Sequence, residues 1–470
     1  MAKKSNEYLD VAPFKIIETG FHKDRAMVSE SIFSLGNEYA GIRGFFEEGY
    51  GGKSLKGSYF NGIYEYALKE TENAYRGIVK RTHFTINSVN WIKCKIEVAG
   101  EVLDLDSAKI DTFVRELDMK SGLLKRSFNW HTKAGVISLC FERLMSMDNC
   151  HEMLQRITFS SKNEVQVKLS MHLDSNVLHW SKDCYWNREK EIIEDNEYGV
   201  FTSTLSTNQS LLSLMQIETK EEPVNSYTLD KEVVVEYDFK LKDQTTFTRY
   251  VINICDKTSK DNFVCLFKQA KEELKCFVSK GYSKMLSENQ DYYRKVWDSS
   301  DIEIIGDPKN QQGIRYCIFQ LEQTYHGFAK DNNIGAKGLT GEAYSGHAFW
   351  DSETYCLPFY LFSNKEAAKN LLMFRYNTLD EARKRASDLD CVGACFPIAT
   401  RNGKEGCNLW QHASLQFQPS TGVVYAIMHY MNLYKDVEFM QNYGLEMVVE
   451  VCKFMLSRGQ YNQDHSGFGY

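Results

Sequence analysis

The first half of the chain alternates between apolar and polar residues with a period of two. One such face consists of Ile92, Cys94, Ile96 and Val98, with charged residues between them. Similar alternating faces occur over residues 165–173 and 233–241. Because successive side chains of a strand point to opposite faces of a sheet, these runs predict half-buried antiparallel strands. Their recurrence, with few helical windows, predicts a β-sandwich domain over residues 1–258.

The period changes after residue 258. Leu266, Ala270, Leu274 and Phe277 recur at intervals of three and four residues. That spacing predicts an amphipathic helix, and residues 259–308 are assigned to a helical linker. Helical windows joined by long loops then fill residues 309–470. Two helix starts, at 363–366 and 378–381, match the capping-box pattern. The predicted fold class is therefore multidomain, with β structure first and α structure after it.

Composition narrows the class of protein without naming a function. Hydrophobic residues make up 43% and charged residues 25% of the chain, which is typical of a soluble globular protein. The net charge of -7 gives no electrostatic footprint for nucleic acid or an anionic membrane, so neither is expected as a partner. The 13 cysteines form no CxxC pair and have no zinc spacing. We expect reduced thiols, a cytoplasmic location and no metal site.

The loop at residues 337–353 has the densest set of groups that could carry chemistry. Glycines punctuate it, and Trp350 stands beside the carboxylates of Glu342, Asp351 and Glu353. A pyranose is bound by such groups, because an indole packs under its apolar face and carboxylates accept from its hydroxyls. The alternative is a loop packed by Trp350, with Asp351 capping the next helix. The residues alone leave both interpretations open.

A second loop, at residues 397–412, is rich in Gly and Asn and ends in Trp410, Gln411 and His412. It could equally be a surface loop with a turn at Asn402-Gly403. His412 has no evident Ser or Cys nucleophile partner, and nucleotide-binding glycine motifs are absent. Inverting glycosyl transfer needs a carboxylic acid to protonate the leaving oxygen, and the spacing of the carboxylates does not show which one could do so.

Four segments resemble motifs of glycoside hydrolase family 65, which includes maltose, kojibiose, nigerose and trehalose phosphorylases. The segment 341–353 has the pattern G-E-x-Y-x-G-H-x-F-W-D-x-E. The segment 33–44 resembles the family's F-S-L-G-N-G-Y-x-G-x-R-G signature, and 115–122 resembles its R-x-L-D-M-x-x-G strand. The segment 393–397 is similar to its G-A-x-x-P loop.

The resemblance implies an N-terminal β-super-sandwich, a helical linker and the first part of an (α/α)6 barrel. It implies reversible phosphorolysis with inversion, in which inorganic phosphate attacks an α-glucoside and gives β-glucose 1-phosphate. Phosphate is then a co-substrate, and no cofactor is needed. Trp350 and Asp351 would hold the glucosyl unit, with His347, Tyr344 and Trp410 near that pocket. For the full-length protein, the resemblance implies a homodimer.

The family's general acid is a Glu in a G-P-D-E motif, which the resemblance places beyond Tyr470. No catalytic residue is therefore assigned within the chain, which is expected to be a truncated fragment, inactive alone. Two other interpretations stay open. One is a trehalase-like hydrolase of the same fold, which would use water in place of phosphate. The other is a non-catalytic carbohydrate-binding fragment.

Overall fold

The computed structural model describes residues 7–68, 76–179, 183–463 and 467–469. Its contacts divide the chain into two compact units. Residues 1–63 and 87–323 form the first, which we call the sheet unit, and residues 64–86 and 324–470 form the second, which we call the helical unit. The domain boundaries predicted from the sequence, 1–258, 259–308 and 309–470, remain a prediction. In the structure, residues 64–86, which contain a hairpin, belong to the same compact unit as residues 324–470.

The sheet unit is built on one large antiparallel network, which has 13 strands among the described residues. In spatial order its main path is β1 (Leu9–Ala12), β2 (Lys15–Thr19), β10 (Ile110–Asp118), β11 (Leu123–Thr132), β12 (Gly135–Met145), β13 (Glu152–Asp174), β18 (Glu232–Asp256), β16 (Ser210–Glu218), β15 (Glu197–Thr204) and β14 (Trp186–Glu194). β17 (Asn225–Leu229) pairs with β18, β8 (Cys94–Val98) with β13, and β9 (Glu101–Val102) with β8. A smaller sheet joins β3 (Leu35–Gly36), β4 (Ala40–Ile42) and β5 (Ser58–Phe60), preceded by η1 (Lys23–Arg25) and α1 (Ala26–Ile32).

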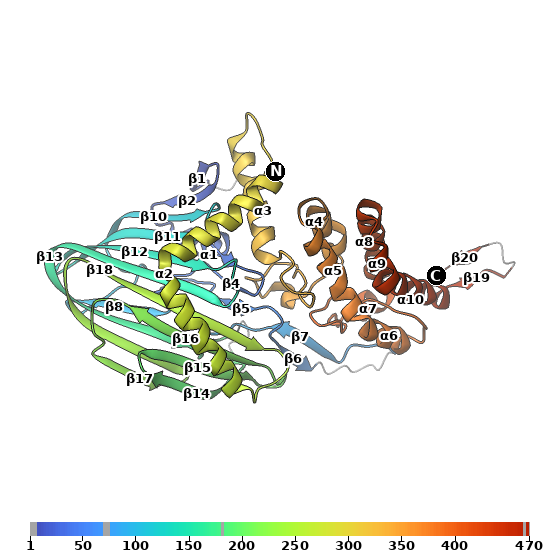
Figure 1. The fold of residues 1–470 in the computed structure, drawn as a ribbon, viewed down its shortest axis with the longest axis horizontal. Helices are drawn as coiled ribbons and strands as arrows, with labels where there is room; N and C mark the ends of the chain where they lie inside the picture. Colours follow the sequence, from blue (N-terminus) through green and yellow to red (C-terminus); the bar gives the residue numbers. More distant parts are fainter. Residues whose placement is uncertain (1–6, 69–75, 180–182, 464–466, 470) are drawn as a thin grey trace. The chain divides into compact units, whose positions relative to one another are not determined.

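Two very long strands, β13 and β18, run side by side through this unit (Figure 1). Their register shifts between Ser161 and Val165, and a shift of this kind bends a strand and increases its twist. Before the shift β13 also pairs with β12, and after it β13 pairs with β8. The apolar faces that alternate over 165–173 and 233–241 are buried. The prediction of a large antiparallel sheet domain is confirmed.

The helix α2 (Phe263–Ser300) covers part of this sheet, lying against β16 and β18 (Figure 1). Leu266, Ala270, Leu274 and Phe277, the residues whose spacing predicted it, are all buried. Burying a side chain of the size of leucine or phenylalanine stabilises a fold by about 1.5–3 kcal/mol relative to leaving it exposed. The helical linker predicted from the sequence therefore corresponds to a helix that packs on the sheet.

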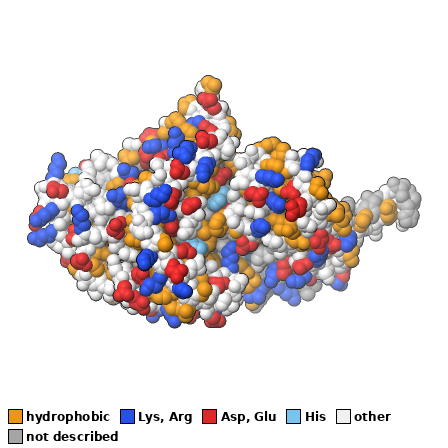
Figure 2. Space-filling view, viewed as in Figure 1, with side chains coloured by type: hydrophobic (Ala, Val, Ile, Leu, Met, Phe, Trp, Pro, Cys, Tyr) orange, Lys and Arg blue, Asp and Glu red, His pale blue; other side chains and the backbone are white. Residues whose placement is uncertain are grey.

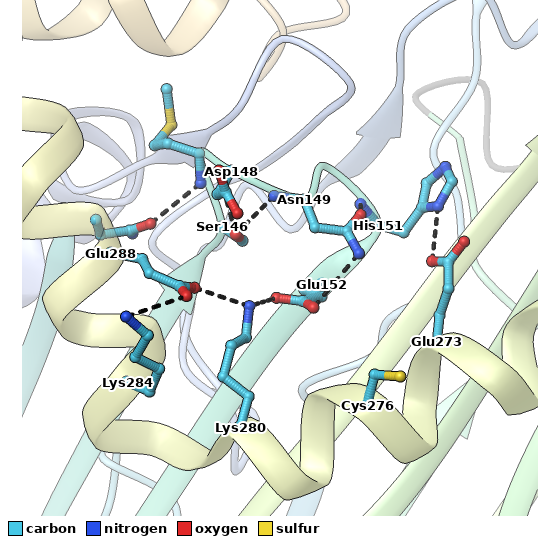
Figure 3. Close-up of polar contacts among 12 residues, drawn as sticks. Ser146, Asp148, Asn149, His151, Glu152, Glu273, Cys276, Lys280, Lys284 and Glu288 are labelled. Carbon is cyan, nitrogen blue, oxygen red and sulfur yellow. Dashed lines mark hydrogen bonds and ion pairs between the residues drawn. The ribbon is translucent and has the colours of Figure 1, made fainter.

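A polar cluster holds α2 where the helix kinks at Gly281, whose backbone is left-handed (φ 75°). Lys280 lies between Glu152, at the start of β13, and Glu288, beyond the kink (Figure 3). Nearby, Nδ1 of His151 lies 2.9 Å from the Glu273 carboxylate. Lys280, just before the kink, pairs with Glu152 of β13 and with Glu288 after the kink, so it connects both halves of α2 to the sheet.

The helical unit begins with the hairpin of β6 (Tyr64–Leu68) and β7 (Arg81–Thr85) and resumes after α3 (Pro308–Thr324). Its helices are α4 (Leu357–Ser363), α5 (Lys365–Asn377), α6 (Leu379–Asp388), α7 (Trp410–Leu415), α8 (Gln418–Tyr434), α9 (Val437–Phe439) and α10 (Leu445–Arg458). Short helical turns are η2 (Ala343–Gly346), η3 (Ser352–Cys356) and η4 (Met440–Gly444), and the last strands are β19 (Gln460–Tyr461) and β20 (Phe468–Gly469). Apolar residues of α4, α5, α8 and α10 share one core.

Charged side chains of both signs are interspersed over the face of the sheet unit seen in Figure 2. No broad region of one sign gathers there, in keeping with the net charge of -7. In the part of the chain that the structure describes, no helix combines the length and apolarity that crossing a membrane requires.

Candidate functional site

The two loops that the sequence singled out separately lie together in the helical unit. Ala348, from the first loop, forms an antiparallel bridge with Thr400, from the second, through backbone hydrogen bonds of 2.7 and 3.0 Å. The guanidinium of Arg401 also donates to the carbonyl of Gly346 at 2.9 Å. The two loops, which lie about fifty positions apart in the sequence, are therefore joined by hydrogen bonds and support each other.

A histidine that sequence reasoning missed joins this support. His83, on β7, accepts from the backbone N–H of Arg401 at 3.0 Å, while its own carbonyl lies 2.6 Å from Nε2 of His347. The two imidazole rings are in edge-to-face contact, with centroids 4.8 Å apart. His83 lies in a short strand far from both loops in the sequence, and no motif pointed to it.

Both histidines are held neutral. Burial, together with the nearby cationic groups, lowers the pKa of His83 to about 2 and burial lowers that of His347 to about 4. Nε2 of His347 donates to the His83 carbonyl, and His347 is 5% exposed. Through these contacts His347 holds the loop that carries Trp350 in place. Gly406 permits this close packing, because a Cβ there would lie 2.7 Å from the His347 ring.

A buried carboxylate closes the second loop. Glu405 accepts hydrogen bonds from the backbone N–H groups of Ile398 (2.8 Å), Cys407 (2.9 Å) and Ala399 (3.3 Å). In a helix or strand these backbone N–H groups would be paired with carbonyl groups. In this loop the Glu405 carboxylate accepts from them, so they are not buried without partners. Burial raises the pKa of Glu405 to about 6. The loop is thus held by its own buried carboxylate, and the turn expected at Asn402-Gly403 is compatible with the left-handed backbone of Gly403 (φ 87°).

Trp350 and Asp351 lie at the start of η3. Trp350 is half-buried, its ring tilted against that of Tyr355 at 5.9 Å between centroids. Asp351 is exposed and occupies the N-cap position of η3, but its side chain makes no capping hydrogen bond there. An accessible carboxylate beside a partly exposed indole is the pair of groups that a pyranose ring requires.

The remaining predicted residues have different surroundings. Tyr344 is 62% exposed and left-handed (φ 55°), with its ring edge-on to Phe349. Trp410 begins α7, and its indole N–H donates to the carbonyl of Arg76 at 2.8 Å. Glu353, named with Asp351 as a candidate carboxylate, is 1% exposed and pairs with Arg375 through bonds of 2.7 and 2.9 Å. Glu353 therefore supports the loop through this buried ion pair.

Within the described residues, no group of three or more His, Cys, Asp or Glu side chains could hold a metal ion. All thirteen cysteines lie in that part of the chain, and the structure pairs none of them in a disulfide. The buried acid–base groups that support the two loops, His83, His347 and Glu405, are all engaged in backbone hydrogen bonds. The arrangement is that of two loops held by buried side chains.

Comparison with known proteins gives matches along most of the chain. The N-terminal domain of glycosyl hydrolase family 65 matches residues 16–296, and the central catalytic domain of that family matches residues 315–469. The maltose phosphorylase of Bacillus subtilis is 31% identical over 466 residues, covering 97% of this chain and 61% of its own length. The kojibiose phosphorylase of Thermoanaerobacter brockii is 32% identical, covering 92% of this chain and 58% of its own length.

A solved structure provisionally named a kojibiose phosphorylase, from the human microbiome, is 56% identical with a TM-score of 0.95, covering 98% of this chain and 61% of that one. The chain thus spans about three fifths of the length of these relatives. None of these matches tests whether the 470 residues act alone, and the expectation of an inactive fragment is not borne out by them. Since the first family domain alone matches more than half of the sequence, the chain belongs to glycosyl hydrolase family 65.

Proposed function

We propose that this protein catalyses the reversible phosphorolysis of an α-glucoside with inversion. An oxygen of inorganic phosphate forms a bond to the anomeric carbon as the glycosidic C–O bond breaks. The products are β-glucose 1-phosphate and the free acceptor sugar, whose oxygen gains a proton. The observation that carries this proposal is family membership, together with phosphorylase relatives that align with more than nine tenths of the chain.

We assign the glucosyl unit to the loop at Trp350 and Asp351. The indole offers an apolar face for the ring, and the Asp351 carboxylate accepts hydrogen bonds from a pair of hydroxyls. His347 positions this loop through His83, and we assign Tyr344 and Trp410 to the surroundings of the bound sugar. The support beneath it is preformed, so ligand binding need not order the loop. We assign a catalytic acid to none of the described residues.

Phosphate dependence distinguishes the proposed reaction from hydrolysis. The purified protein, incubated with kojibiose, maltose or trehalose, should release glucose 1-phosphate only when inorganic phosphate is supplied. Products are measured by chromatography, first without phosphate and then at two phosphate concentrations that differ ten-fold. Equal sugar release without phosphate would show a trehalase-like hydrolase. Binding of sugar with no release under either condition would show a carbohydrate-binding protein, and each of these results contradicts the proposal.

The Asp351→Ala substitution should weaken binding of glucose 1-phosphate by about five-fold to a hundred-fold. This range converts the roughly 1–3 kcal/mol that an unmet polar group costs when its partner is removed. Calorimetric titration measures the change. Asp380→Ala is the matched control, because Asp380 is also an exposed aspartate of the helical unit, with its side chain 85% exposed. Unchanged affinity in Asp351→Ala would exclude Asp351 from the site.

A cytoplasmic location and a homodimer are also proposed. The first is supported by thirteen cysteines of which none is paired. The second rests on resemblance to the family alone.

A further inference from the structure

A cavity of about 770 Å³ lies wholly within the sheet unit. Its wall is formed by residues from three segments that are far apart in the sequence, 45–58, 87–102 and 172–178. The volume is within the range of pockets that hold small-molecule ligands. The cavity shares no residue with the two loops described above, so a ligand in it would be additional to the sugar assigned to Trp350.

The carboxylates of this wall are buried and paired. The side chains of Glu47 and Glu48 are 4% and 0% exposed, and both form ion pairs with a buried arginine. The Asp174 side chain is 12% exposed, and one of its oxygens lies 2.8 Å from Nζ of Lys93. Lys93 also pairs with Glu232 at 2.6 Å, so its own charge is balanced. The wall therefore presents little negative charge to a ligand.

Two other lysines of the wall carry positive charge that nothing balances. Lys56 and Lys95 are exposed and line the cavity, and neither forms an ion pair with any residue that the structure describes. Asp104, which accepts from the backbone N–H of Gly51 at 3.0 Å, does not line the cavity. The accessible charge in the cavity is therefore positive, and this favours an anionic ligand.

A glycine-rich loop supplies one of these lysines. Residues 49–57 read G-Y-G-G-K-S-L-K-G, and Gly49, Gly52 and Gly57 all line the cavity. Gly49 has a left-handed backbone (φ 88°), and a Cβ at Gly52 would lie 2.4 Å from the ring of Tyr50. Both positions therefore favour glycine, which leaves the backbone uncovered. An uncovered backbone can approach an oxyanion closely and donate its N–H groups to it.

The rest of the wall suits the uncharged part of a ligand. The ring of Tyr50 is half-buried and packs edge-on against Phe21 and Phe46, with centroids 5.7 and 5.5 Å apart. Burial raises the pKa of Tyr50, so its hydroxyl stays protonated and can donate a hydrogen bond. Asn90 and Asn176 add amide groups that can both donate and accept. Aromatic carbon beside hydroxyl and amide groups complements a sugar, whose C–H faces and hydroxyls need both kinds of contact.

We propose that this cavity binds a phosphorylated sugar, with the phosphate group at Lys56 and Lys95. A phosphate monoester carries a charge of about −1.5 to −2 at neutral pH, which two unpaired lysines balance. A carboxylate would balance only one of them, and lysine is a common binder of phosphate. The sugar ring would lie against Tyr50 and the amide groups. The proposal does not depend on the function proposed for the helical unit, because the two sites have no residue in common.

Calorimetric titration with glucose 6-phosphate tests this site in the full chain, at low ionic strength where screening is weakest. In Asp351→Ala, which disables the proposed glucosyl site, we expect one binding site. Adding Lys56→Gln or Lys95→Gln should weaken binding by about ten-fold each, the change expected when one hydrogen bond from a charged group is lost. Lys275→Gln is the matched control and should leave affinity unchanged, since Lys275 is an exposed lysine of the same unit that does not line the cavity.

Two further titrations separate the parts of the ligand. Glucose and inorganic phosphate should each bind the Asp351→Ala protein at least ten-fold more weakly than glucose 6-phosphate. Equal affinity for inorganic phosphate would overturn the assignment to a sugar phosphate, and equal affinity for glucose would overturn the role of the two lysines. Absence of glucose 6-phosphate binding in Asp351→Ala would overturn the site, as would unchanged affinity when both lysines are replaced and circular dichroism shows a folded protein. None of these titrations measures phosphorolysis, so failure of the function proposed above would leave their results unaffected.

Discussion

Replacing Arg375 by methionine should lower the free energy of unfolding of the helical unit by about 3–5 kcal/mol. Arg375 and Glu353 are 0% and 1% exposed, and two hydrogen bonds of 2.7 and 2.9 Å join them. The substitution leaves the Glu353 carboxylate buried without a cation. Because Glu353 lies in η3, two residues after Asp351, the loop that carries the proposed sugar site should loosen as well.

A second variant separates the charge effect from loss of packing. Replacing both residues, in Arg375→Met with Glu353→Met, removes the unpaired charge and should recover most of the stability. Lys384→Met is the control, since its ion pair with Glu381 is exposed and its loss should cost about 1 kcal/mol or less. Hydrogen–deuterium exchange at increasing urea concentration, followed in peptides from 357–377, reports on this unit alone. A single variant as stable as the Lys384→Met protein would show that the pair does not support the loop.

The sequence predicted the architecture wherever a regular period extends over a long element. The alternating faces of β13 and β18 and the helical spacing of α2 are each decided by many positions, so single exceptions do not hide them. Short elements were harder to predict from the sequence. Residues 302–305 have a strand-like pattern but form no strand. The capping box at 363–366 predicted a helix start, yet the cap is Asn364, whose side chain accepts from Ala367 N–H.

The candidate site shows the same contrast. Motifs drew attention to both loops, because glycine, tryptophan and carboxylate residues gather there in the sequence. Their mutual support could not be predicted, since it depends on His83, a single histidine in a short strand more than 260 residues from His347. Likewise, the sequence alone does not distinguish the exposed Asp351 from the buried Glu353, two residues further on. Only tertiary contacts give these two carboxylates different roles.

In the sheet unit, Arg126→Met should have an effect as large as that at Arg375. The Arg126 guanidinium donates to Glu48 at 2.7 and 2.5 Å and to Glu47 at 2.8 Å, and all three side chains are buried. Arg143 contacts the other oxygen of Glu47 at 2.7 Å, so Glu47 keeps a cation in the variant while Glu48 loses its own. At neutral pH we expect a loss of about 3–5 kcal/mol in the free energy of unfolding.

This loss should depend on pH in a direction that identifies Glu48. Burial raises the pKa of Glu48 even with Arg126 beside it, and removing the cation raises that pKa further. A carboxyl whose pKa is raised by folding stabilises the fold below its unfolded pKa, and that stability is lost as the pH rises through the folded pKa. Urea unfolding should therefore show a smaller difference from the wild type at pH 5 than at pH 8. In Arg294→Met, which removes an exposed ion pair with Asp291, the difference from the wild type should not change between pH 5 and pH 8. An equal loss at both pH values would mean that Arg126 contributes through packing, because only an unpaired Glu48 carboxylate takes up a proton as the pH falls.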